Sequence, residues 1–177
     1  VKPQVTLAEN TYDELGRLKT SKKNNQANLT TTFGYNVRSW TKSISSPLFS
    51  QTLYYNDQYV SSAKRYNGNV GAMTWQVQGD KLRGYSFAYD NLSQLTAANY
   101  LESGTASNNY KTSYTYDKHG NMKTLQRYGK TTSAAYGLID NVTLTYTGNQ
   151  LTKADDAVAT ISLAESNDFK NYVNTAT

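Results

Sequence analysis

Cysteine is absent from this chain of 177 residues, and its absence excludes several kinds of chemistry. A disulfide framework, a thiolate zinc site and a cysteine nucleophile all need it. Histidine is almost absent too, since His119 is the single one. A general base needs a nucleophile within reach and an orienting partner, and nothing beside His119 supplies them. We therefore expect His119 to be an exposed turn residue and the chain to have no catalytic site.

Long apolar runs are also missing. No stretch of 18 apolar residues occurs, so we expect no membrane-spanning helix. The first residues, Val1 to Gln4, have neither the charged nor the apolar region of a signal peptide. Hydrophobic residues make up 37% of the chain, below the usual globular share, which predicts a thin core.

Basic and acidic residues are both scattered along the chain. The net charge of +5 comes from 18 basic and 13 acidic residues, and the longest basic runs are pairs such as Lys22 and Lys23. A nucleic-acid-binding protein usually gathers its basic residues on one face or helix. We therefore expect no nucleic-acid partner.

Tyrosine is abundant, with 16 residues against 4 Phe and 2 Trp. Thr and Tyr favour strands, Asn favours turns, and no long apolar pattern of helical period is present. These features predict an all-β fold over a single region, 1–177, with 155–177 as its least repeat-like part. We expect loops at 21–28 and 104–109, and a strand at 157–163.

An eight-residue pattern recurs along the chain. It is fullest at 115–122, returns at 11–18 and 88–95, and has a looser copy at 34–41. Two shortened relatives lie at 66–70 and 146–151. The tyrosines that anchor these copies are spaced by 23 to 31 residues: Tyr12, Tyr35, Tyr66, Tyr89, Tyr116 and Tyr146. Such spacing is typical of repeat architectures.

Each copy predicts a β-hairpin. Asp after the anchor tyrosine can accept a hydrogen bond from the backbone two residues on, and Gly three residues after Asp suits a left-handed conformation. In the shortened copies, Asn67-Gly68 and Gly148-Asn149 are dipeptides of tight hairpins. A lone hairpin is marginal, so the hairpins must extend one another into one sheet. Besides the anchors, the predicted turn residues are Asp13, Gly16, Asn36, Asp90, Ser93, Asp117, Gly120 and Gly148.

The pattern at Tyr114 to Met122 resembles the tyrosine–aspartate (YD) repeat of RHS proteins. This family includes bacterial wall-associated proteins, shell subunits of insecticidal toxin complexes and animal teneurins. The phrases at 35–40, 53–56 and 66–70 resemble large RHS-like surface proteins of Bacteroidetes.

The resemblance implies a long antiparallel sheet that twists and spirals into a hollow shell, in a secreted or cell-surface bacterial protein. Toxin-type members end the shell with a self-cleaving segment of the form Arg-Tyr-Asp-Pro. Neither proline of this chain, Pro3 or Pro47, follows Asp. We therefore expect neither self-cleavage nor a payload. We expect the chain to be an excerpt or a degenerate copy of a larger repeat protein.

Three functions are weighed on this basis. The first is a non-catalytic scaffold that forms part of a shell wall, without cofactor or metal. The second is a carbohydrate-binding module in which Trp40 and Trp75 stack on sugars, because aromatic faces bind the apolar faces of sugars. The third is a hydrolase that uses the turn aspartates Asp13, Asp90 and Asp117. Their turn role already explains these carboxylates. Asp155 and Asp156 lack the spacing of a calcium loop.

Strand edges are the expected contact surfaces, either with other repeats or between copies of the chain. The edges predicted from the sequence are 5–12 and 142–146. The second is apolar on one face and lacks charge and proline, which favours pairing with another chain. We expect either self-association through these edges or burial of one of them by the chain's own terminal segment.

Overall fold

The structure is a computed structural model that describes residues 5–60, 62–159, 161–163 and 168–169. Twelve strands form one sheet whose strand order follows the sequence from β1 to β12. The nine strand pairs with a defined register are all antiparallel. One short 3₁₀ helix, η1 (Ala27–Leu29), is the helical element of the described residues. The predicted all-β fold is confirmed.

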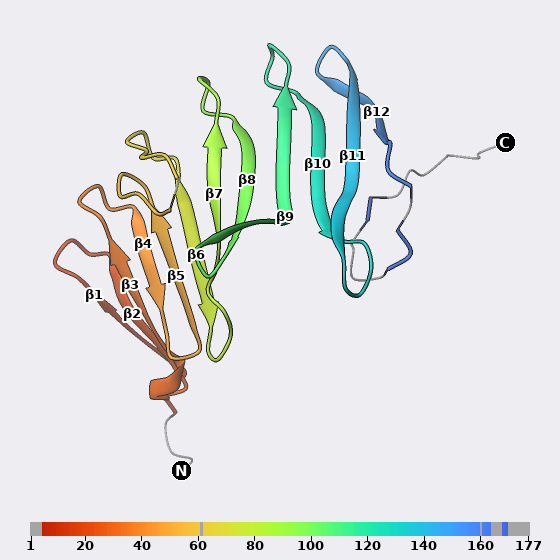
Figure 1. Cartoon of the computed structure of the whole chain (residues 1–177). Coiled ribbons are helices and arrows are strands. Elements are labelled where there is room, and N and C mark those ends of the chain that lie inside the picture. The colour runs from red at the N-terminus through yellow and green to blue at the C-terminus, as the bar shows by residue number, and fades with distance from the viewer. Residues whose placement is uncertain (1–4, 61, 160, 164–167, 170–177) are drawn as a thin grey trace. The chain divides into compact units, whose positions relative to one another are not determined.

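Contacts divide the chain into two compact units, and Figure 1 shows the strands of each. The first unit is Val1–Ser86 with Leu101–Gly104, and the second is Phe87–Tyr100 with Thr105–Thr177. The strands wholly within the first unit are β1 (Ala8–Tyr12), β2 (Leu18–Lys23), β3 (Thr30–Tyr35), β4 (Thr41–Ser45), β5 (Phe49–Tyr54) and β6 (Ala72–Val77).

The remaining strands belong to the second unit or cross its boundary. Strands β7 (Arg83–Tyr89) and β8 (Leu95–Glu102) each contribute residues to both units. The second unit then contains β9 (Thr105–Tyr116), β10 (Met122–Lys130), β11 (Tyr136–Thr147) and β12 (Gln150–Asp156). In each unit the turns that follow the anchor tyrosines lie at the same end of the strands (Figure 1).

The core is thin, because a single sheet has no second layer to bury its faces. Few hydrophobic side chains of the described residues are fully buried: Tyr55, Ala72 and Leu101 in the first unit, and Ala98, Tyr100, Ile139 and Val142 in the second. Tyrosine rings supply part of the packing. Tyr100 meets Tyr110 edge to face, with ring centroids 5.1 Å apart. The sheet is therefore held together by hydrogen bonds and by contacts between neighbouring strands.

Four expectations about local structure are wrong. Asn67-Gly68 does not form a hairpin, because it lies in the connection between β5 and β6, which pair directly with each other. Residues 105–109 belong to β9 rather than to a loop, since positive φ at Ser103 and Gly104 makes a tight turn just before it. Residues 21–23 likewise belong to β2. The described part of 157–163 contains no strand.

The predicted edge at 142–146 is also wrong. Strand β11 pairs with β10 on one side and with β12 on the other. The turn at Gly148 and Asn149 folds β12 back onto it, and Thr147 pairs with Gln150. The outer strands of the sheet are thus β1 and β12.

Candidate functional site

Four hairpin turns share one hydrogen-bond pattern, and they begin at Asp13, Asn36, Asp90 and Asp117. In each, the side-chain Oδ1 accepts hydrogen bonds from the backbone N–H groups two and four residues later, at 2.8 to 3.0 Å. Two backbone hydrogen bonds of 2.9 to 3.1 Å close each turn. Asx side chains that accept from the backbone in this way fix a turn locally.

The residue three positions after the Asx has a left-handed backbone in all four turns. Gly16 and Gly120 have φ of +74° and +85°, whereas Ser39 and Ser93 have φ of +60° and +64°. Glycine adopts this region without steric cost, and other residues do so with strain. Ser39 and Ser93 thus occupy the glycine position of the pattern in the same conformation, with strain that glycine does not have.

Hydrogen bonds lower the pKa of two of the turn carboxyls. The backbone N–H of Arg17 does most to lower the pKa of Asp13 below its usual value, with further help from the Arg17 side chain. The pKa of Asp117 is lowered chiefly by the side-chain amide of Asn121, whose Nδ2 donates to Oδ2 at 2.9 Å. Both effects favour the ionised carboxylate because the hydrogen bonds are made to its charged form.

A second recurring contact, here called the tyrosine bridge, joins three of the tyrosines to the preceding hairpin. The hydroxyl of Tyr35 donates to the carbonyl of Leu18 at 2.9 Å, and that of Tyr116 donates to the carbonyl of Leu95 at 2.7 Å. Both acceptors lie six residues after the anchor tyrosine of the preceding hairpin.

Tyr55 makes the third tyrosine bridge, to the carbonyl of Thr41 at 2.9 Å. Thr41 again lies six residues after an anchor, Tyr35. Tyr55 is thus the structural equivalent of the anchors, whereas Tyr66 is 62% exposed and lies outside any strand. Sequence reasoning missed Tyr55 because no Asp-x-x-Gly follows it. The signal that could have found it is Tyr54-Tyr55-Asn56, which has the tyrosine and Asx of the pattern.

The same bulge recurs in four return strands. The anchor tyrosine pairs with the first or second residue of the return strand, and the next residue is left out of the register before pairing resumes. The bulged residues are Lys19, Lys42, Lys123 and Thr152. A bulge adds local twist and bends the strand, so each hairpin carries the same distortion at the same place.

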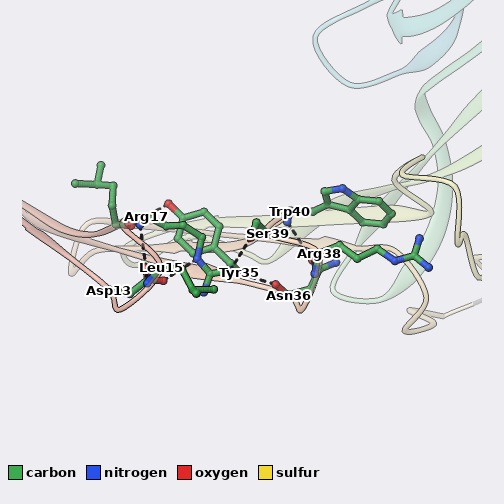
Figure 2. Close-up of polar contacts among 9 residues, drawn as sticks. Asp13, Leu15, Arg17, Tyr35, Asn36, Arg38, Ser39 and Trp40 are labelled. Carbon is green, nitrogen blue, oxygen red and sulfur yellow. Dashed lines mark hydrogen bonds and ion pairs between the residues drawn. The ribbon is translucent and has the colours of Figure 1, made fainter.

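Side chains also connect neighbouring turns (Figure 2). Arg17 Nε donates to Asp13 Oδ2 at 2.7 Å, and its Nη1 reaches Ser39 Oγ of the next turn at 3.1 Å. The Arg17 guanidinium lies over the Tyr35 ring, 4.7 Å from its centroid. In the second unit Asn121 bridges to Asn149 Oδ1 at 3.2 Å.

A groove of about 440 Å³ lies beside the second of these turns, in the first unit. It is lined by Tyr35, Asn36, Val37, Arg38, Trp40, Lys42, Asn56, Arg65 and Tyr66. Its charged lining residues are all basic, and Lys42 is paired with Asp57 at 2.6 Å. The groove therefore combines aromatic rings with excess positive charge.

The two tryptophans predicted to stack on sugars lie in different settings. Trp40 lines the groove, where the Arg38 guanidinium is 5.2 Å from its ring centroid and Tyr55 packs against it at 5.1 Å. Trp75 lies on β6 and stacks on Tyr85, with centroids 5.8 Å apart. Both rings thus have aromatic neighbours, and Tyr66 offers the most exposed ring of the groove.

The predicted turn aspartates have a structural role in the described residues. Each is occupied by the backbone N–H groups of its own turn. His119 is exposed, and its backbone N–H donates to Asp117 Oδ1 at 2.8 Å.

A cluster of three carboxylates that sequence reasoning did not find lies in the second unit. Oxygen atoms of Asp140, Asp156 and Asp168 are within 4.8 Å of one another. Asp140 is fully buried and forms an ion pair with Arg127, and the Phe169 N–H donates to it at 2.7 Å. Among the described residues this is the group that could hold a metal ion. The three residues share no spacing motif, so no local signal pointed to them.

Comparisons with known proteins add no relative. No protein-family model matches the chain, and no curated protein matches its sequence. Within the described residues, no helix has the length and apolar character needed to cross a membrane.

Proposed function

We propose that the chain is a non-catalytic scaffold module, in which repeated hairpins extend one sheet to form part of a wall. The observation that carries this proposal is the repetition of contacts: the four Asx turns and three tyrosine bridges use the same atoms at equivalent positions. Repeats that contact chiefly their neighbours can be added without disturbing distant ones.

The family resemblance supports the same proposal. A YD-repeat member would use such a sheet as the twisted, spiralling wall of a shell in a secreted or surface protein. Its partners would be other repeats of a longer chain, or further copies of this chain paired through strand edges. The turn carboxylates bind their own backbone, which gives them a structural role in the hairpins.

Duplication of one repeat tests the scaffold. A second copy of residues 89–115, inserted directly before Tyr116, adds one return strand and one outgoing strand and so preserves the antiparallel alternation. We expect the longer chain to fold, with a proportionally larger β-signal in circular dichroism and with slow hydrogen exchange at the added turn amides. The control is an insert of the same composition in scrambled order. If the duplicated chain unfolds as the scrambled one does, the scaffold proposal is wrong.

The second candidate function is carbohydrate binding, which the groove favours. Aromatic rings beside basic side chains suit a sugar that carries a carboxylate, because the ring contacts the apolar face and the cation pairs with the charge. The exposed Tyr66 ring, and Arg38 and Lys42 nearby, would supply these contacts.

Titration calorimetry with uronic-acid oligosaccharides, and with neutral glucose oligosaccharides of equal length, tests this candidate. Binding of the acidic sugars alone, lost in Tyr66→Ala, would support it. The matched control is Tyr12→Ala, which removes an equally exposed ring that is not part of the groove lining. No binding of either sugar would overturn it.

A further inference from the structure

We propose that the β1 edge of one copy pairs with the β12 edge of a second copy, and that the Tyr12 hydroxyl donates a hydrogen bond across this joint to the carbonyl of Leu151. The inference rests on the proposed scaffold function and names its partner: a second copy of this chain, joined head to tail. The joint would be a fourth tyrosine bridge, formed between molecules rather than within one.

Within the described residues, Tyr12 is the anchor tyrosine that has no preceding hairpin to contact. Tyr12 is 61% exposed, and within the part of the chain that the structure describes its hydroxyl has no partner. Tyr35, Tyr55 and Tyr116 each reach a carbonyl of the hairpin before them. Tyr12 begins the same turn pattern as Tyr35 and Tyr116, so its hydroxyl is placed to do the same.

The acceptor lies on the opposite edge at the equivalent position. Leu18 and Thr41, which accept tyrosine bridges, both pair with the anchor of their own hairpin and precede the bulged residue. Leu151 pairs with Tyr146 and precedes the bulged Thr152, so it occupies this place in the last hairpin. Its side chain is 50% exposed.

The two edges are compatible as strands. Sequence order alternates strand direction, so an odd-numbered strand beside β12 continues the antiparallel pattern. Every residue of β1 is exposed, and β12 is exposed over most of its length. An unpaired strand edge presents free N–H and C=O groups that pair readily with another chain.

Charge does not oppose the joint. Glu9 on β1 accepts a hydrogen bond from Lys22 at 3.3 Å, and Lys153 on β12 donates to Asp155 at 3.0 Å. Each charged pair is contained in its own hairpin. Pairing of the two edges would therefore bring together backbone groups without leaving an unpaired charge between them.

Tyr146 provides the matched control. It is an anchor tyrosine, but β11 is already paired on both sides, and within the described residues its hydroxyl has no partner. Removal of the Tyr146 hydroxyl should leave association unchanged, whereas removal of the Tyr12 hydroxyl should weaken it. A hydrogen bond of ordinary net strength corresponds to a decrease of about fivefold in the association constant.

Sedimentation velocity over a series of concentrations tests the proposal with the wild type, Tyr12→Phe and Tyr146→Phe, after thermal melts have shown that all three fold. We expect reversible addition of copies in the wild type, unchanged association in Tyr146→Phe, and about fivefold weaker association in Tyr12→Phe. A wild type that stays monomeric would overturn the proposal. So would equal effects of the two variants.

Cysteine pairing identifies the joined edges. Thr20 pairs with Thr32, three residues before the anchor Tyr35, so the equivalent Lys153 would face Glu9, three residues before Tyr12. Because the chain has no cysteine, Glu9→Cys on β1 and Lys153→Cys on β12 each introduce a single thiol. Under mild oxidation a mixture of the two proteins should form mixed dimers faster than either protein pairs with itself. Faster self-pairing would show a head-to-head joint and overturn the proposal. If copies do not associate but the chain with the duplicated repeat folds, the joint is wrong and the scaffold proposal stands. If copies associate but the chain with the duplicated repeat unfolds, the scaffold proposal is wrong.

Discussion

At the scale of single residues, the left-handed position of the Asx turns determines what each turn tolerates. Gly120 and Ser93 occupy it at φ of +85° and +64°. Ser93 already carries a side chain there, so part of the strain is present in the native protein. Glycine carries none, and a Cβ added to Gly120 would lie 3.3 Å from Gln94 Nε2.

We therefore expect Gly120→Val to destabilise the protein more than Ser93→Val. A β-branched residue in the left-handed region costs about 1 to 3 kcal/mol, and Ser93→Val adds only the difference between Ser and Val. Thermal melts of both variants measure this. Equal losses would show that the two turns carry equal strain.

Acid should affect the turns at Asp13 and Asp117 and spare the turn at Asn36. Asp13 and Asp117 have pKa values held below their usual range by hydrogen bonds from Arg17 and Asn121. A carboxyl whose pKa is lower in the folded than in the unfolded protein stabilises the fold at pH values above its unfolded pKa of about 3.9. This stability is lost as the pH falls through the folded pKa. Asn36 makes the same hydrogen bonds without titrating.

NMR amide shifts can follow this difference. The backbone N–H signals of Arg17 and Asn121 should titrate with midpoints below the usual aspartate pKa, and that of Trp40 should stay constant over the same range. A Trp40 signal that moves with the other two would indicate a general acid transition instead of titration at each turn.

At the scale of hairpins and strands, the sequence predicted those turns that a few neighbouring residues determine. Asp117 and Gly120 specify a turn within four residues, and the structure has it there. The Asn67-Gly68 signal is also local, yet pairing of β5 with β6 overrides it. The tight hairpin predicted at Gly148-Asn149 is present, yet the edge at 142–146 was misassigned because the polar sequence of β12, which covers that edge, does not resemble a strand.

Contacts between distant residues lay beyond sequence reasoning. The tyrosine bridges join residues 14 to 21 apart to backbone carbonyls, which leave no mark in the sequence. The carboxylate cluster combines β11, the end of β12 and Asp168, and the fold alone brings them together. The groove likewise depends on the irregular connection that places Arg65 and Tyr66 beside Trp40.

The ion pair between β10 and β11 joins a buried carboxylate to a partly exposed guanidinium. Asp140 is fully buried, and Arg127 is its ion-pair partner. Arg127→Met would remove the cation that faces Asp140 and its two neighbouring carboxylates, and loss of one partner of a buried pair costs about 3 to 5 kcal/mol.

Denaturant unfolding of Arg127→Met should show a loss of about 3 kcal/mol at neutral pH. Arg83→Met is the control, because its ion pair with Asp80 lies at the surface. Surface pairs contribute about 1 kcal/mol or less. Equal losses of unfolding free energy in the two variants would show that burial of the carboxylate does not determine how much each ion pair stabilises the protein.

At the scale of the whole molecule, the strand order makes β1 and β12 the outer strands and puts every other strand between neighbours. Thr143 pairs with Thr124 on one side and Asp155 on the other. A lysine at this position would stand on the sheet face and not at an edge.

We therefore expect Thr143→Lys to leave association between copies unchanged, whereas Asn10→Lys on β1 should weaken it by placing charge at a free edge. Sedimentation of the two variants at matched concentration compares them. Loss of association in Thr143→Lys with none in Asn10→Lys would mean that copies meet through sheet faces.

The recurring Asx turn also governs how such a chain can change over evolutionary time. Each turn is specified by its own few residues, and three of the four also receive one tyrosine hydroxyl from the next hairpin. Insertions at the opposite strand ends alter the spacing between anchors while the turns keep their atoms in place. Copies can thus drift apart in length and composition until a tyrosine, an Asx and a left-handed residue are all they still hold in common.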